Sequence, residues 1–309
     1  MTTTVHELPS AAARPPVRPA TRRIATAVAL AVALGVTGCG VAMKFGYGQA
    51  APLAYRWLDG YVEFEPKQET RVRGALDEFM VWHRKTQLRD YVQLIGKAEN
   101  EIAGDVSGER MCGWVQDVRT RLDALLERAM PAMVEVLPTL QPNQISNIEK
   151  KQVERNEDWR DDYLQRDSAK RKREAVKREL ERAESLYGRL EREQKALIEK
   201  SVAESPLDGE RSYALRLGRQ RDLLDTLRRV AAPGTAPKDV EAQVRGYVKR
   251  IERSPREEDR RYAQQVTDYN CAFAAALHNT TTPSQRRHAA KKLKGYGEDF
   301  RALAGDPST

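Results

Sequence analysis

Three cysteines are the residues of this chain with the most predictable covalent chemistry. They are Cys39, Cys112 and Cys271 in a sequence of 309 residues. Cys39 directly follows an apolar run near the amino terminus, whereas Cys112 and Cys271 fall within segments of helical pattern. A thiol can be acylated, can pair as a disulfide, or can remain buried as a small apolar group. The choice among these depends on the compartment in which the protein works.

The histidines give no sign of a metal centre. His83, His278 and His288 are widely separated, and none lies at ligand spacing from another His or Cys. His83 lies at the edge of an apolar helix stripe, which is typical of a structural histidine. The sequence also holds no Gly-rich phosphate loop and no G-x-S-x-G elbow. We therefore predict no cofactor and no metal, and we assign no catalytic residue.

An acidic turn is the remaining candidate for chemistry. Asp158, Asp161 and Asp162 lie close together and could offer oxygens to a divalent cation. Arg155 and Arg160 lie among them and neutralise the cluster locally. A solvated, charge-balanced helix surface is the preferred interpretation.

The first 38 residues have the pattern of an export signal. Arg22 and Arg23 are followed by "IATAVALAVALGVT", which carries no charge. A spanning helix needs about 20 apolar residues, so this shorter run predicts a cleaved signal rather than a membrane span.

The end of that signal resembles the bacterial lipobox, in the residues Val36-Thr37-Gly38-Cys39. The resemblance implies cleavage before Cys39, diacylglycerol on its thiol, and acylation of the new amino terminus. Two or more acyl chains hold a protein firmly at a bilayer. The alternative is an ordinary signal in which Cys39 is incidental. Gly40, rather than Asp, follows the cysteine, and by similarity to enterobacterial lipoproteins this implies sorting to the outer membrane, facing the periplasm. The implied partners are the lipid bilayer and the lipoprotein processing and sorting machinery.

The predicted periplasmic location affects the expected oxidation state of the two remaining cysteines. In an oxidising compartment Cys112 and Cys271 can form a disulfide, and closing so long a loop would stabilise the fold by about 4–5 kcal/mol in the chain-entropy model. Two buried, unpaired thiols are the alternative, because sequence alone does not give their separation.

The composition predicts an all-α fold. Charged residues make up 32% and aromatic residues 6%, and apolar residues recur at spacings of three and four along most of the chain. We expect a multi-helix bundle of amphipathic helices with one long, highly charged helix over 149–182, and an interruption of the preceding apolar stripe at Pro131. The domains are a signal at 1–38, a lipidated tether at 39–52, a helical periplasmic domain at 53–304 and a disordered tail at 305–309.

Several helix starts share a capping pattern in which glutamine stands three residues after the cap residue. Its best example is Thr282-Pro283-Ser284-Gln285, with weaker copies that end at Gln68, Gln144 and Gln194. The intervals are unequal, which excludes a solenoid of fixed period. Capping alone explains the pattern, although the starts at Thr282 and Gln141 locally resemble the Leu-Thr-x-x-Gln motif of the Spy and CpxP periplasmic chaperones.

A broader resemblance covers nearly all of residues 39–304. The chain is similar to a proteobacterial lipoprotein family catalogued only as a domain of unknown function. The similarity lies in "YRWLDGYVEFEPKQ", Trp82-His83-Arg84, "NEDWRDDYL", "LYGRLEREQ" and "TTPSQRRHAAKKLKGYGEDFRALA". It implies lipidation and helices, and it implies no particular activity.

Two functional classes follow from these observations. Removing the four Arg and one Glu that precede Cys39 leaves 49 basic and 44 acidic residues, a net charge of +5. So small an excess, with signs interleaved, does not predict a nucleic-acid partner. The first hypothesis is a non-enzymatic, chaperone-like envelope protein that binds unfolded or envelope proteins. The second is an envelope hydrolase or transferase with paired carboxylates on facing helices.

Overall fold

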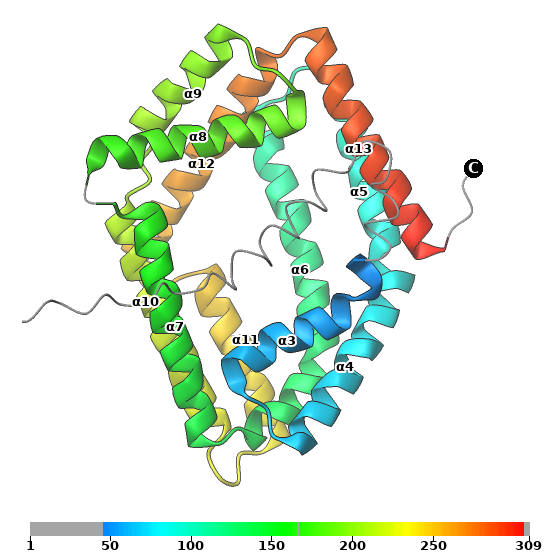
Figure 1. The fold of residues 1–309 in the computed structure, drawn as a ribbon, viewed down its shortest axis with the longest axis vertical. Coiled ribbons are helices and arrows are strands. Elements are labelled where there is room, and N and C mark those ends of the chain that lie inside the picture. Colours follow the sequence, from blue (N-terminus) through cyan, green and yellow to red (C-terminus); the bar gives the residue numbers. More distant parts are fainter. Residues whose placement is uncertain (1–45, 166, 306–309) are drawn as a thin grey trace, which may run out of the picture.

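The computed structural model describes residues 46–165 and 167–305, and all regular elements within them are helices (Figure 1). The predicted signal, Cys39 and residues 306–309 of the predicted tail lie outside the described residues. The all-α prediction is confirmed. The elements are α3 (Ala50–Val62), α4 (Pro66–Lys85), α5 (Gln87–Glu101), α6 (Gly108–Val136), η1 (Leu137–Thr139), α7 (Pro142–Tyr163), α8 (Ser168–Tyr187), α9 (Arg192–Glu204), α10 (Gly209–Val230), α11 (Pro237–Glu252), α12 (Glu257–Asn279) and α13 (Pro283–Ala304).

The single long charged helix expected over 149–182 is wrong, because this stretch forms parts of two helices, α7 and α8. Helix α7 ends at Tyr163, and Leu164 leaves the helical conformation. The Asp167 carboxylate then accepts the backbone N–H groups of Ala169 and Lys170 and starts α8. An Asp in this position satisfies amide groups that would otherwise lack partners, so it favours a new helix over a continued one.

Two other boundaries also differ from expectation. Helix α6 runs through Pro131 rather than stopping there. Its neighbour Met130 is buried against Val230, Val240 and Val244, so tertiary packing holds a turn that lacks one backbone hydrogen bond. At the amino-terminal end, α3 begins at Ala50, inside the segment predicted as a tether.

The described chain consists of two halves with the same order of elements (Figure 1). Helix α3 of the first half corresponds to α8 of the second, and α4 with α5 corresponds to α9 with α10. Helix α6 corresponds to α11 together with α12, and α7 corresponds to α13. In Figure 1 the two halves are related by a half-turn about the line of sight, with α3 at the bottom and α8 at the top.

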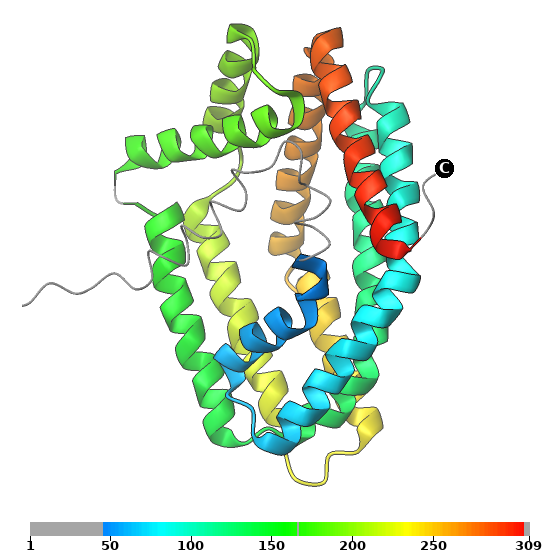
Figure 2. The same cartoon turned by 45° about the vertical axis from the view of Figure 1, so that its right-hand side comes forward.

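The halves pack by exchanging helices across this pseudo-twofold axis. Helix α5 of the first half lies along α13 of the second, while α10 of the second half lies along α7 of the first (Figure 2). Equivalent aromatic contacts mark the two seams. The rings of Tyr91 and Phe300 are 5.9 Å apart, and those of Tyr213 and Trp159 are 5.4 Å apart. Helix α6 packs against both α11 and α12, and this contact closes the ring of helices.

A buried pair of glutamines joins two helix starts within the first half. Gln68 and Gln144 each donate a side-chain N–H to the other's side-chain carbonyl, over 3.1 and 2.7 Å. The Gln68 amide also donates to the Thr139 carbonyl, and the Gln144 amide donates to the Glu63 carbonyl. Each side-chain carbonyl in addition accepts the backbone N–H of its own cap residue. The capping pattern therefore joins α4 to α7 as well as starting each helix.

The second half repeats this arrangement at the starts of α9 and α13. Gln194 and Gln285 exchange hydrogen bonds of 2.8 and 2.9 Å. Gln194 donates further to the Thr280 carbonyl, and Gln285 donates to the Arg189 carbonyl. In all four cases the accepting carbonyl lies two residues before the partner's cap residue. We call these two pairs the glutamine clasps, and their matching geometry supports the division into two equivalent halves.

The halves differ in one major element. The first half has a single helix, α6, where the second has α11 and α12, separated by residues 253–256. The second clasp correspondingly spans 91 residues, against 76 for the first. Arg260 closes the extra bend by donating to the carbonyls of Ser254 and Pro255, at 2.9 and 2.7 Å. This bend forms one wall of a large groove.

Candidate binding groove

A groove of about 910 Å³ lies among α6, α10 and the junction of α11 with α12. Its volume is at the upper end of what ligand sites usually provide. Apolar contributions come from Leu215 of α10 and Ile251 of α11. Eight arginines line the groove: Arg119, Arg219, Arg221, Arg250, Arg253, Arg256, Arg260 and Arg261. Four acidic residues accompany them: Asp222, Glu252, Glu257 and Asp259.

Two arginine–carboxylate pairs fix the shape of the groove. Arg250 makes a two-pronged contact with Asp222, in which each hydrogen bond is 2.9 Å long. Arg256 makes a similar contact with Asp259, with hydrogen bonds of 2.7 and 2.9 Å. Asp259 is 4% exposed, and the hydrogen bonds from Arg256 lower the pKa of its carboxyl despite this burial. The Asp259 carboxylate therefore remains charged. The Arg250–Asp222 pair joins α11 to α10, whereas the Arg256–Asp259 pair fixes the start of α12.

Four other arginines are available for a ligand. Within the described residues, the side chains of Arg119, Arg219, Arg221 and Arg253 make no hydrogen bond or ion pair, and all four are exposed. They project from α6, from α10 and from the bend after α11. The lining carries eight arginines and four carboxylates, so its net charge is +4. A guanidinium offers a planar fork of donors that matches a carboxylate or a phosphate.

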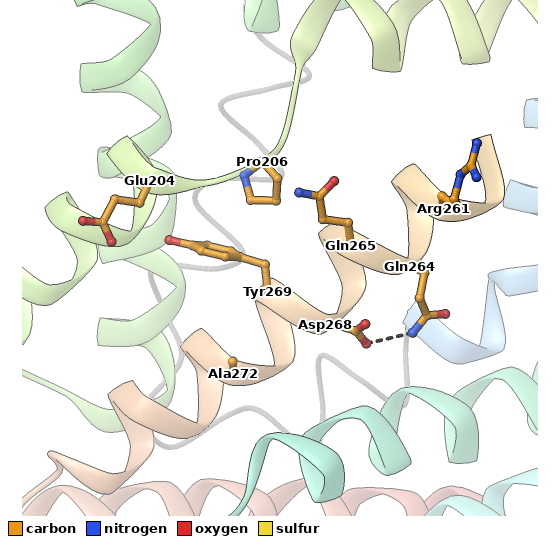
Figure 3. A pocket seen from close by; sticks show the side chains of 8 residues that line it. All are labelled: Glu204, Pro206, Arg261, Gln264, Gln265, Asp268, Tyr269 and Ala272. Atoms are coloured by element: carbon orange, nitrogen blue, oxygen red, sulfur yellow. Dashed lines mark hydrogen bonds between the residues drawn. The ribbon is translucent and has the colours of Figure 1, made fainter. Parts of the chain in front are cut away.

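A second hollow of about 690 Å³ adjoins the groove, and Arg261 and Gln264 line both. Figure 3 shows Tyr269 of α12 pointing toward Pro206 and Glu204, at the end of α9. The Tyr269 hydroxyl donates to the Ser201 carbonyl at 2.7 Å, which ties α12 to α9. The two hollows therefore adjoin on α12, with most of the arginines around the first and an aromatic ring at the second. We refer to the two hollows together as the α12 groove.

The two internal cysteines lie next to the α12 groove. Cys112 of α6 and Cys271 of α12 are joined by a disulfide, with their Cα atoms 5.4 Å apart. The structure therefore has the bridged arrangement of the two that the sequence left open. Gly108 lies close by, where a Cβ atom would come within 3.3 Å of the Ala272 Cα, so a side chain there would push the helices apart. Disulfide and glycine together hold α12 against α6.

Two of the three histidines in the described residues form buried or half-buried hydrogen bonds. His278 is fully buried and lies between the Tyr187 hydroxyl, at 3.0 Å, and the Gly104 carbonyl, at 2.7 Å. Burial lowers the pKa of His278 and raises that of Tyr187 to about 12. His83 lies between the hydroxyls of Tyr47 and Tyr91, and burial lowers its pKa also. Neutral imidazoles in these positions connect helices.

The third histidine and the acidic turn remain apart from the groove. His288 of α13 is exposed and lies beside Gly188. Asp158 forms an ion pair with Arg155, while Asp161 and Asp162 line a separate polar hollow near Lys170. No group of three or more His, Cys, Asp or Glu side chains in the described ranges is arranged to hold a metal ion.

The sequence also belongs to a larger group of proteins. A family model described only as a family of unknown function, DUF6279, matches residues 60–243. The chain belongs to this family. The DUF6279 match begins in α3 and ends within α11, so it covers most of the first half and the second half as far as α11, but neither the bend nor α12 and α13. No curated protein and no solved structure matches the chain.

Sequence analysis placed Cys112 and Cys271 but did not identify the arginines of the groove. The run "RSPREEDRRY", residues 253–262, is dense in arginine and was the available signal. Acidic residues within this run balance its positive charges. The excess of positive charge arises only in the folded chain, where α6 and α10 bring Arg119, Arg219 and Arg221 to the same groove. Cys39 lies outside the described residues, and among the helices that are described none combines the length and apolarity needed to span a bilayer.

Proposed function

We propose that this protein is a lipid-anchored envelope protein that binds partly folded polypeptides without catalysing a reaction. The observation that carries the proposal is the α12 groove, an open surface in which unpaired arginines adjoin apolar and aromatic side chains. A surface of this kind can hold mixed anionic and apolar segments without a deep, selective cavity. The periplasmic address inferred from sequence further suggests action without ATP.

The anchor at Cys39 is supported by the lipobox-like residues Val36-Thr37-Gly38-Cys39. The Cys112–Cys271 disulfide is compatible with an oxidising compartment. Labelling cells with a palmitate analogue tests the anchor, with Cys39→Ala as the matched variant. We expect the label in the membrane fraction of the wild-type protein only. Label retained by Cys39→Ala would place the anchor elsewhere.

The carboxylate-enzyme hypothesis receives less support from the described residues. Acid–base chemistry by two carboxyl groups requires environments that move their pKa values apart, with one raised. Every described carboxyl whose pKa is shifted has it lowered, chiefly by hydrogen bonds: Glu101, Glu127, Glu154, Asp167 and Asp259. Asp259, the one buried carboxylate among them, is occupied by Arg256. These observations favour binding over catalysis.

Light scattering of a chemically unfolded client tests the proposed binding. The full chain, held in nanodiscs of neutral lipid, should slow client aggregation at equimolar ratio and low salt, relative to empty nanodiscs. The effect should weaken as salt rises, because exposed charges are screened beyond about 10 Å at 0.1 M ionic strength. Absence of suppression at low salt would contradict the proposal.

A further inference from the structure

We propose that the α12 groove recognises extended polypeptide segments that carry carboxylates at one end and an aromatic or large aliphatic residue at the other. This inference rests on the proposed function and specifies its ligand. The carboxylates would occupy the end lined by Arg219, Arg221 and Arg253, and the apolar residue would lie against Tyr269 and Pro206.

The length of the groove favours an extended chain over a small molecule. Its two hollows share Arg261 and Gln264, and their lining runs along α12 from Arg260 to Ala272. Those twelve helical steps correspond to about 18 Å at 1.5 Å per residue. An extended peptide rises about 3.3 Å per residue, so five or six residues would span it.

The pattern of charge favours spaced carboxylates over a continuous phosphate backbone. The unpaired arginines are interrupted by Glu252 and Glu257, which line the same groove. A polyphosphate or nucleic acid carries a charge at every unit and would be repelled at these positions. A peptide can place its carboxylates opposite the arginines and its uncharged residues opposite the glutamates. Asp222 and Asp259 show how carboxylates are held here, through two-pronged contacts with Arg250 and Arg256.

The other end of the groove supplies apolar contact. Pro206 lines this end, in the short connection between α9 and α10. Tyr269 faces Pro206 from α12, as Figure 3 shows. The Tyr269 hydroxyl is engaged by the Ser201 carbonyl, which fixes the ring in place. An aromatic or leucine side chain of a bound segment would bury these exposed atoms.

Fluorescence anisotropy with a defined peptide tests the inference. The probe is a labelled peptide of about twelve residues, long enough to cover the groove, with Glu at one end and Phe and Leu at the other. The full chain in neutral-lipid nanodiscs should bind it more tightly than a matched peptide with Gln in place of Glu. Replacing Arg219, Arg221 and Arg253 by Ala should weaken binding about tenfold, as expected for three exposed charge contacts.

A matched control removes three other exposed arginines whose side chains make no hydrogen bond or ion pair in the described chain: Arg56, Arg189 and Arg287. Both triple variants lose the same charge, so the control should change the affinity less than about twofold if recognition is local. Tyr269→Ala should weaken binding of the Phe-containing peptide but not of one in which Phe and Leu are replaced by Ser. Equal losses in both triple variants, or equal binding of the Gln peptide, would overturn the inference.

Two further outcomes separate this inference from the proposed function. If the protein suppresses client aggregation but does not bind the acidic peptide, the ligand assignment is wrong and the chaperone-like role stands. If the peptide binds at the groove but aggregation is not suppressed, the ligand assignment is supported and the chaperone-like role is wrong. Displacement of the peptide by sodium pyrophosphate at matched charge would identify a phosphate site instead and overturn the proposal.

Discussion

The two halves of this protein share a scaffold but differ at the helix that closes the ring. In the first half, α6 is continuous through Pro131, whereas in the second half the equivalent segment bends between α11 and α12. The glutamine clasps are the same in both halves, which indicates that they maintain the fold. The α12 groove has one wall at the bend, where the halves differ. The comparison therefore separates structural features, which occur twice, from the candidate binding surface, which occurs once.

Removing the disulfide between the halves should have the largest effect. Cys112 belongs to the first half and Cys271 to the second, 159 residues apart. The double Cys→Ser variant should lose about 4–5 kcal/mol of unfolding free energy in the chain-entropy model. Urea denaturation measures this, and reductant should destabilise the wild type but not the variant. A loss below about 1 kcal/mol would show that helix packing alone holds the halves together.

Breaking either glutamine clasp should cost less, and by similar amounts in the two halves. Gln144→Ala removes the side-chain donor to the buried Glu63 carbonyl and the hydrogen bonds exchanged with Gln68. Gln285→Ala does the same to the Arg189 carbonyl and Gln194. We expect a loss of about 3 kcal/mol from each, since a buried unsatisfied group costs about 1–3 kcal/mol. Urea titrations of the two variants test the equivalence. A large loss in one half only would contradict it.

Replacing the proline in the continuous helix should have a smaller, opposite effect. Pro131→Ala restores a backbone N–H within α6 and should raise the unfolding free energy by about 1 kcal/mol, part of the usual proline penalty in helices. Thermal unfolding is a sufficient measurement. Destabilisation would mean that the proline ring itself makes stabilising contacts. It would also mean that packing of the residues next to Pro131 is not what keeps α6 continuous.

The smallest expected effect is a pH dependence around His278 that the equivalent position of the first half lacks. Counted back from the clasp glutamines, His278 occupies the place that Leu137 has in the first half. Burial lowers the pKa of His278, so the unfolded chain binds the proton more readily than the folded one. Its contribution to stability is therefore complete above about pH 6.5 and is lost as the pH falls below that value.

Hydrogen exchange between pH 7.5 and 5.5 resolves this effect by region. Allowing for the intrinsic pH dependence of exchange, protection around Gly104 and His278 should decrease, while the corresponding region around Leu137 should not change. Carboxyl groups with lowered pKa values, such as Asp259, take up protons only at more acidic pH. They therefore do not contribute to the change between pH 7.5 and 5.5. An equal decrease around Leu137 would contradict the assignment. His278→Gln provides the matched variant, in which the difference between the His278 and Leu137 regions should disappear.

Much of the fold was predictable because its signals are local. Apolar spacing indicated the helices, and the cap pattern at Thr282-Pro283-Ser284-Gln285 gave a helix start that the structure confirms. The pairing of Gln68 with Gln144 was not predictable, since capping explains each glutamine without a distant partner. The break before Asp167 was missed because charged residues on both sides suggested a single exposed helix. Asp167 itself was the available signal, as a capping residue within that run.

The groove was less predictable than the fold because its charge is assembled from three distant segments. Arg119, Arg219 and Arg253 lie on α6, on α10 and in the bend, and each lies near acidic residues in sequence. Their lack of ion-pair partners is a property of the packed helices. The cysteines could be named from sequence, but their separation depends on how α6 meets α12.

The most direct test of the proposed binding surface is hydrogen exchange of the full chain with and without a chemically unfolded client. The account predicts new protection along the α12 groove, in the bend at residues 253–256 and on α12 from Arg260 to Ala272. It predicts that adding the client leaves the exchange protection of the glutamine clasps unchanged. Protection confined to the opposite seam between α5 and α13, or no protection under conditions where the client is held, would contradict the account.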